Sequence, residues 1–201
     1  IKILQAGVNH FRIHTYNGLD LVTKIGKWNG NKKSVITCCK PLPLAAEGGF
    51  EFIMCLPTGS LAVVNRDEVS IAQCIPGLNN EPVTAMDTIL VKEATAEEPP
   101  MFNVIIGGGN SMIKMLQGME LEPILEIDLK KNWGPEKDKE YGLIPKANTR
   151  GFRSLCVDKS KRKIVYGTSG GEIGEIDLET KSDVNTGPIV YSHFKDCLGA
   201  L

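Results

Sequence analysis

The fold is decided by the stretch VIIGGGNSMIKML, residues 104–116, in which a short apolar run, a glycine turn and a second apolar run follow one another. Apolar runs of this length on either side of a glycine turn are typical of a β-hairpin. Three further stretches share the pattern: ILQAGVNHFRI at 3–13, FIMCLPTGSLAVV at 52–64 and IVYGTSGGEIGEI at 164–176. We expect each to form a hairpin whose glycine supplies the positive φ of the turn.

The spacing of these hairpins indicates an internal repeat. The turn glycines Gly7, Gly59, Gly109 and Gly171 lie 52, 50 and 62 residues apart. A four-stranded propeller blade takes about 40–50 residues. Two polar stretches, residues 92–100 and 130–149, are rich in charged residues and proline and account for the excess as loop insertions.

The remaining apolar runs supply the other strands of each repeat. We expect outer strands at 21–25, 69–75, 124–129 and 189–191, and inner strands at 34–39, 82–89, 153–158 and 196–201. No stretch shows a long helical period. The predicted fold is therefore an all-β propeller of about four blade equivalents: a partial blade at 1–30, blades at 31–80, 81–150 and 151–194, and the first strand of another at 195–201.

Two closures of these blades are compatible with the sequence. The last strand could complete the first blade and close a four-bladed ring, or the chain could be part of a larger propeller. We expect the larger propeller, because the strand pattern stops abruptly. An open edge would then pair with missing blades or with another copy of the chain.

Composition excludes several classes of partner. The 23 basic and 24 acidic residues nearly cancel, so no overall field favours nucleic acid or an anionic membrane. No apolar run reaches the roughly 18 residues of a membrane span. The six cysteines contain no Cys-x-x-Cys pair, and we expect them to be reduced, buried and free of metal.

No catalytic or cofactor site is expected. The histidines are His10, His14 and His193, and the first two are too far apart on one strand to bind one metal. Residues 107–111, GGGNS, could suggest a phosphate cradle, but an alternating run and not a helix follows them. A hairpin turn is the better interpretation, and the same holds for residues 167–171.

Two loops are candidates for contact with a partner. The insertion KKNWGPEKDK at 130–139 combines basic and aromatic residues, and its candidate contacts are Lys130, Lys131, Trp133, Lys137 and Lys139. Trp28 is a second candidate, beside Lys27 and ahead of Lys32 and Lys33. Long loops on a rigid scaffold often carry function. The alternative for both is a solvated loop.

Five segments of the sequence together resemble the repeats of one known protein family. The segment GFRSLCV at 151–157, followed by IVYGT at 164–168 and GEIGEI at 171–176, is similar to the inner strand and hairpin of that family. AGVNHFRI at 6–13 and PVTAM at 82–86 resemble its other segments, in the same order along the chain. This ordered set resembles the WD40 repeats of the echinoderm microtubule-associated protein-like family, although no Trp-Asp dipeptide ends any repeat.

The resemblance implies a WD40-type propeller, seven-bladed in the parent protein, that binds microtubules or tubulin in the cytoplasm without catalysing a reaction. Lysines in the contact loops would suit the acidic surface of tubulin. A general WD40 scaffold for a complex outside the cytoskeleton is the second hypothesis, because a fold does not fix its partner. An enzyme is the third, and no acid–base cluster, metal set or nucleotide loop favours it.

Overall fold

A computed structural model of the chain describes residues 2–42, 50–65, 67–93, 95, 97–98, 100–118, 120–129, 151–158, 163–169, 172–179, 182–183 and 190–191. The regular elements named among them are all strands. The strands are β1 (Lys2–Gly7), β2 (His10–Tyr16), β3 (Leu21–Ile25), β4 (Cys38–Pro41), β5 (Phe50–Cys55), β6 (Ser60–Asn65), β7 (Ser70–Pro76), β8 (Val83–Lys92), β9 (Met101–Gly108), β10 (Met112–Gln117), β11 (Glu122–Asp128), β12 (Phe152–Asp158), β13 (Lys163–Thr168), β14 (Glu172–Asp177), β15 (Ser182–Asp183) and β16 (Val190–Tyr191).

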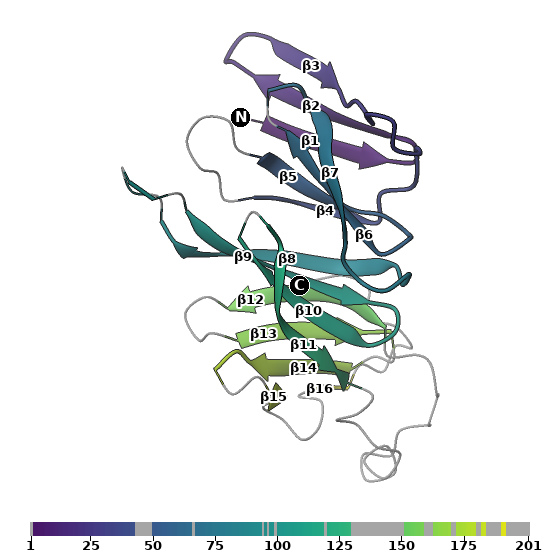
Figure 1. Cartoon of the computed structure of the whole chain (residues 1–201), viewed down its shortest axis with the longest axis vertical. Coiled ribbons are helices and arrows are strands. Elements are labelled where there is room, and N and C mark those ends of the chain that lie inside the picture. Colours follow the sequence, from purple (N-terminus) through teal and green to yellow (C-terminus); the bar gives the residue numbers. More distant parts are fainter. Residues whose placement is uncertain are drawn as a thin grey trace.

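The strands form four antiparallel sheets (Figure 1). In the order of hydrogen bonding, the first sheet is β1-β2-β3, the second is β4-β5-β6-β7, and the third is β8-β9-β10-β11. The fourth is β12-β13-β14-β15, with β16 also paired to β14. Each sheet is thus a meander of neighbouring strands, and the all-β prediction is confirmed.

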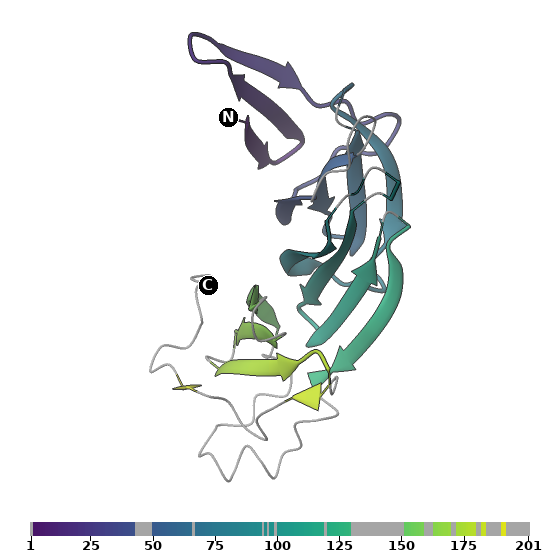
Figure 2. The ribbon, with the colours of Figure 1, turned by 90° about the vertical axis from the view of Figure 1, so that its left-hand side faces the viewer.

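The sheets follow one another along an arc, with the first and the fourth at its two ends (Figure 2). Within the described residues no strand pairing joins the first sheet to the fourth. Four antiparallel sheets in this arrangement are compatible with a β-propeller, and a closed ring is not formed by them. The predicted last strand at 195–201 lies outside the described residues.

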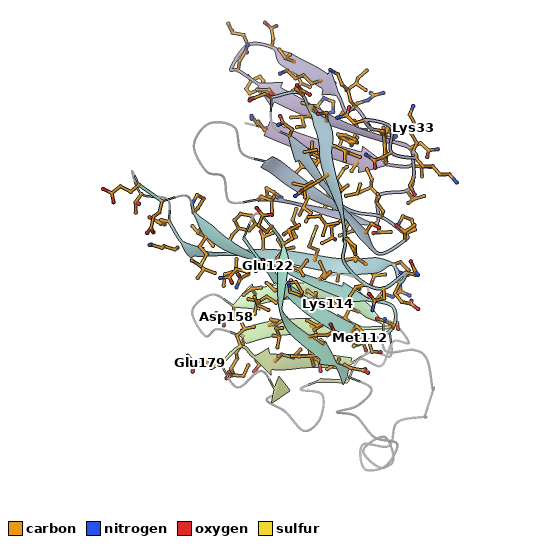
Figure 3. The ribbon with its side chains drawn as sticks, viewed as in Figure 1. Lys33, Met112, Lys114, Glu122, Asp158 and Glu179 are labelled. Carbon is orange, nitrogen blue, oxygen red and sulfur yellow. The ribbon has the colours of Figure 1, made fainter. Side chains whose placement is uncertain are left out.

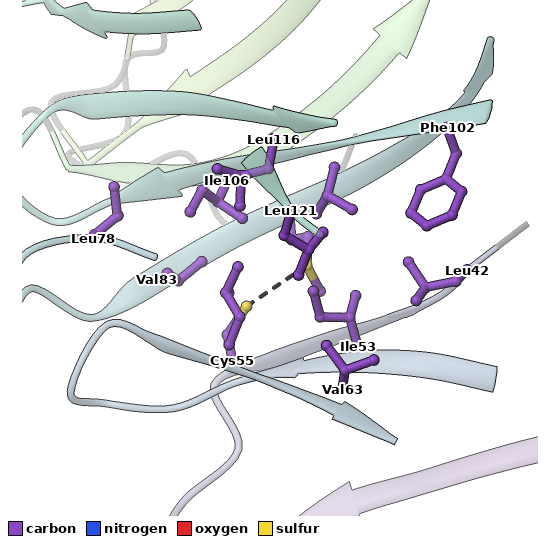
Figure 4. Packing of buried hydrophobic residues seen from close by; sticks show 13 residues of the cluster. Leu42, Ile53, Cys55, Val63, Leu78, Val83, Phe102, Ile106, Leu116 and Leu121 are labelled. Carbon is purple, nitrogen blue, oxygen red and sulfur yellow. Dashed lines mark hydrogen bonds between the residues drawn. The ribbon is translucent and has the colours of Figure 1, made fainter. Parts of the chain in front are cut away.

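Each pair of consecutive sheets encloses its own apolar cluster. The first and second sheets share a cluster built on Phe11 and Phe52, and the third and fourth share one built on Ile105 and Phe152. Between the second and third sheets lies the cluster of Figure 4: Leu42, Ile53, Cys55, Leu61, Val63, Leu78, Val83, Met86, Phe102, Val104, Ile106, Leu116 and Leu121. The second and third sheets are therefore buried on both faces, which explains the uninterrupted apolar runs of their central strands.

Strand β8 connects three sheets through polar side chains. The Asp87 carboxylate accepts a hydrogen bond from the Val157 N–H at 2.9 Å, and its other oxygen lies 3.2 Å from the Lys40 Nζ. Thr88 Oγ1 donates to the Pro41 carbonyl at 3.3 Å, and Thr84 Oγ1 donates to the Phe152 carbonyl. These bonds hold β4, β8 and β12, the first strands of consecutive sheets, side by side.

The predicted inner strand at 34–39 is displaced in the structure, where β4 begins at Cys38. The residues before it pair with the β1–β2 turn of the first sheet: Asn9 N–H donates to the Ser34 carbonyl, and Val35 forms an isolated bridge with Val8. This segment therefore joins two sheets, and its apolar residues do not extend β4.

The four predicted hairpins are present, but glycine does not shape every turn. Gly59 has the expected positive φ of 80°. In the first hairpin Asn9 takes the positive φ, at 61°, and in the third Ser111 takes it, at 71°. Asparagine tolerates this conformation because its short side chain bonds locally. The expectation that Gly7 and Gly109 supply the positive φ is wrong, and Gly171 lies outside the described residues.

Among the five described cysteines, the prediction of burial holds for Cys55 only. Cys38 and Cys39 are partly exposed, and Cys74 and Cys156 are exposed. None of these five forms a disulfide. Cys197 lies outside the described residues.

Candidate protein-contact surface

The segment between β3 and β4, residues 26–37, is tied by its backbone to both flanking sheets. Gly26 N–H donates to the Phe11 carbonyl at 2.9 Å. Lys27 N–H donates to the Val69 carbonyl at 2.8 Å, and Ile71 N–H donates to the Lys27 carbonyl at 2.9 Å. The segment therefore leaves the first sheet along the edge of β7 in a fixed path.

Its other end is fixed in the same way. Ile36 N–H donates to the Gly7 carbonyl at 3.4 Å, and Thr37 N–H donates to the Cys55 carbonyl at 2.9 Å. With both ends fixed, the residues between them have few alternative conformations. We call residues 27–33 the basic turn, since they carry Lys27, Lys32 and Lys33.

Trp28 anchors the basic turn from inside. Its side chain is 7% exposed and belongs to the cluster between the first and second sheets. The indole meets the Phe11 ring edge-on, with the ring centroids 5.7 Å apart. The sequence suggested Trp28 as a contact residue, but burial leaves the indole little surface for a partner. Its observed contacts position the turn.

Two asparagines shape the turn around this anchor. Asn29 has a φ of 44°, and its Nδ2 donates to the Ile71 carbonyl at 3.0 Å. The Trp28 carbonyl accepts both the backbone N–H and the Nδ2 of Asn31, at 2.9 and 2.8 Å. This closed turn brings the chain back on itself, so that Lys27 and Lys32 flank its two ends.

The three lysines of the basic turn face solvent. Lys27, Lys32 and Lys33 are all exposed, and Figure 3 shows the Lys33 side chain projecting from the edge of the molecule. The ion pairs among the described residues use Lys40, Lys92, Lys114 and Lys163 instead. Three positive charges without a described carboxylate partner thus lie on a rigid support, an arrangement suited to an acidic surface.

Sequence reasoning found the lysines but not the side chains that hold them. Asn29 and Asn31 were missed, although the Asn-Gly pair at 29–30 within WNGN is a recognised turn signal. The other predicted contact residues, Lys130, Lys131, Trp133, Lys137 and Lys139, lie outside the described residues.

The two described histidines, His10 and His14, make ordinary local contacts, and His193 lies outside the described residues. His14 Nδ1 lies 2.8 Å from Thr23 Oγ1, and its Nε2 lies 3.1 Å from Gln5 Oε1. His10 Nδ1 lies 3.0 Å from the Val8 carbonyl oxygen. In the part of the chain that the structure describes, His, Cys, Asp and Glu side chains nowhere gather in a group of three or more that could hold a metal ion.

The glycine-rich segment at 107–109 belongs to a hairpin, as expected. Strands β9 and β10 pair antiparallel, with Gly107 opposite Ile113. A strand and not a helix follows the turn, so the backbone N–H groups do not form the helix terminus that a phosphate loop requires.

Comparison with models of known protein families and with curated proteins finds no match to this sequence. Among the described residues there is also no helix with the length and apolar character needed to cross a membrane.

Proposed function

We propose that this chain is part of a WD40-type propeller similar to those of the echinoderm microtubule-associated protein-like family. In this proposal it belongs to a larger, seven-bladed ring and binds microtubules in the cytoplasm without enzymatic activity. The observation that carries the proposal is the rigid basic turn, which presents three lysines to solvent.

The positions of the family-like segments support the fold part of the proposal. PVTAM at 82–86 overlaps the start of β8, and GFRSLCV at 151–157 covers most of β12. These are the first strands of the third and fourth sheets. Equivalent segments thus occupy equivalent places in successive sheets, which is what a repeat of blades requires.

Charge complementarity supports the binding part. An acidic partner such as the tubulin surface attracts lysines, and such attraction weakens as salt rises because exposed charges are screened. The backbone bonds of Lys27 and the burial of Trp28 hold the basic turn before any partner arrives. A preorganised surface loses less conformational entropy on binding than a free loop does.

Co-sedimentation with polymerised tubulin at low and moderate salt tests the proposal. The variant carries Lys27→Gln, Lys32→Gln and Lys33→Gln together. The matched control removes the same three charges from lysines that already pair with carboxylates: Lys92→Gln, Lys114→Gln and Lys163→Gln. We expect the first variant to pellet at least about tenfold more weakly than the unaltered chain, since each exposed charge contact contributes roughly 0.5–1 kcal/mol.

The control variant should pellet nearly as well as the unaltered chain. Equal losses in both variants would show that only overall charge matters and would remove the basic turn from the proposal. If the unaltered chain fails to pellet at low salt, the general scaffold of a complex outside the cytoskeleton takes the place of the microtubule proposal.

A further inference from the structure

Two cysteines lie opposite each other on neighbouring strands of the second sheet. Cys38 on β4 is directly opposite Cys55 on β5 in the strand register. Residues in such opposed positions have Cα atoms about 4.5–5.5 Å apart, within the range that a disulfide spans. The other described cysteines lack such a partner: Cys39 is opposite Met54, Cys74 opposite Ala62, and Cys156 opposite Val165.

The two thiols differ in their surroundings. Cys55 is fully buried in the cluster of Figure 4, where its Sγ lies 3.6 Å from the Met86 Sδ. Cys38 packs against the same cluster but is partly exposed, and its Sγ lies 3.9 Å from the Val83 carbonyl oxygen. One thiol of the pair is therefore open to a small oxidant, and the other is shielded directly beside it.

The pKa values of the two thiols also favour Cys38 as the thiol that reacts first. A hydrogen bond with Cys55, with help from Thr37 and the Lys40 charge, lowers the pKa of the Cys38 thiol despite partial burial. Burial, and then the bond to Cys38, raises the pKa of Cys55 well above its ordinary value. Burial also raises the pKa of the neighbouring Cys39. The thiolate is the reactive form of cysteine, so Cys38 reacts first in this group.

We propose that Cys38 and Cys55 form an oxidation site, in which a peroxide converts the opposed thiols into a disulfide between β4 and β5. An attacking thiol that is accessible and a resolving thiol next to it are the two parts that such a site needs. The proposal rests on the strand register and the burial of the two thiols, and it is independent of microtubule binding.

The reaction balances with hydrogen peroxide as the oxidant. The Cys38 thiolate attacks one peroxide oxygen; the O–O bond breaks, and hydroxide leaves and takes up a proton as water. The Cys55 sulfur then attacks the sulfenic sulfur of Cys38, the S–O bond breaks, and the departing hydroxide takes the Cys55 proton as a second water. Two thiols are oxidised, and one peroxide is reduced to two waters.

Peptide mapping of the full chain after peroxide treatment tests the site. Trypsin does not cleave between Lys40 and Pro41, so it leaves Cys38 and Cys55 in one peptide. Added Glu-C protease cleaves after Glu47 and Glu51 and separates residues 34–47 from residues 52–66. We expect these two peptides joined by a bond that a dithiol reductant breaks, with fragmentation assigning the bond to Cys38 and not to Cys39.

Rates and one variant complete the test. The pair should oxidise at least about fivefold faster than the exposed Cys74 and Cys156, and iodoacetamide should alkylate Cys38 at least about threefold faster than Cys39. Cys39→Ser should leave the crosslink unchanged, whereas Cys38→Ser should abolish it and leave Cys55 reduced.

A crosslink from Cys39 to Cys55, or faster oxidation of Cys74 or Cys156 than of the pair, would overturn the assignment. So would oxidation of Cys38 to its sulfinic acid without a bond to Cys55. The mapping of the unaltered chain decides the question even if Cys38→Ser does not fold.

Discussion

The first and second sheets are built from similar hairpins, yet they differ in burial. All five residues of β3 in the first sheet are exposed, including Leu21, Val22 and Ile25. In the second sheet the four central residues of β6, Leu61 to Val64, are buried. Both strands are apolar, so apolar composition alone does not decide which becomes core. Position decides it: β3 is the edge strand of the first sheet, whereas β6 lies between β5 and β7 in a sheet with an apolar cluster on each face.

The first sheet has a described neighbour on one face only. Phe11 and Ile13 point toward the second sheet and are buried. The alternate residues of β2 lie on the other face, where Tyr16 is opposite Leu21 and Arg12 is opposite Ile25. On that face Tyr16, Leu21 and Ile25 are 44%, 57% and 68% exposed. Similar hairpins thus bury both faces of the second sheet but only one face of the first sheet among the described residues.

The sharpest test of this difference is a pair of identical substitutions. Leu61→Ala removes a fully buried side chain between the second and third sheets, and it should lower the free energy of unfolding by about 3 kcal/mol. Leu21→Ala removes a side chain that is 57% exposed and should cost less than about 0.5 kcal/mol. Urea denaturation of both variants gives the two values.

Similar losses of unfolding free energy in the two variants would contradict the difference in burial between the two sheets. A large loss for Leu21→Ala would mean that the outer face of the first sheet is covered in solution. A small loss for Leu61→Ala would mean that the second sheet contributes little to the cooperative core.

Substitution of one turn glycine in each sheet compares the first and second sheets in the same way. Gly59 in the second sheet has a φ of 80°, and an added Cβ would lie 2.0 Å from the Leu78 carbonyl oxygen. Gly18 in the first sheet has a φ of 102°, with nothing within 4 Å of an added Cβ. Gly59→Ala combines backbone strain with a clash and should cost about 3 kcal/mol, whereas Gly18→Ala should cost about 1–2 kcal/mol through strain alone.

Thermal unfolding followed by circular dichroism measures both glycine variants. The difference between them isolates the close approach of the backbone at Leu78, because both substitutions share an unfavourable φ. Equal losses would show that the second hairpin moves away from Leu78 at little cost.

Polar contacts between sheets should contribute more to the free energy of unfolding than polar contacts on one surface. Asp87→Ala removes the pairing with Lys40 and the acceptor of the Val157 N–H, and it should cost about 2 kcal/mol. Asp87→Asn keeps an acceptor and should cost less. The control Glu98→Ala removes an exposed ion pair with Lys92 and should cost less than about 0.5 kcal/mol. Urea denaturation of the three variants sets the order, and a Glu98→Ala loss as large as that of Asp87→Ala would refute it.

Much of this fold could be predicted, because local chemistry determines it. A glycine turn between two apolar runs specifies a hairpin without reference to the rest of the chain, and all four such stretches pair antiparallel in the structure. The repeat of these hairpins led to the expectation of separate small sheets. Among the described residues, the end of β8 at Lys92 matches the start of the predicted loop at 92–100, which a run of charge and proline indicated.

What could not be predicted depends on contacts between sheets. The apolar residues Val35 and Ile36 resemble the start of a strand, but their backbone bonds go to the turn of the first sheet. Trp28 in a polar, lysine-containing stretch resembles an exposed contact residue, but its ring packs edge-on against Phe11 in the cluster between the first and second sheets. Each case was decided by a partner distant in the sequence, which a local pattern does not reveal.

The smallest expected effect lies at the other end of the arc, on the face of the fourth sheet that points away from the third. Here Lys163 Nζ donates to Glu175 at 2.9 Å. This bond raises the pKa of Lys163, with further contributions from the Glu175, Asp177 and Asp158 charges.

Because the folded pKa is raised, the pair stabilises the fold fully below the unfolded lysine pKa of about 10.4 and loses that contribution as pH rises through the folded value. Glu175→Gln should therefore lower the melting temperature slightly at pH 8 and at low salt, and the gap should close as the pH rises through the folded lysine pKa or as salt is added. A gap that persists at alkaline pH would mean that Glu175 stabilises the fourth sheet through the packing of its side chain and not through its charge.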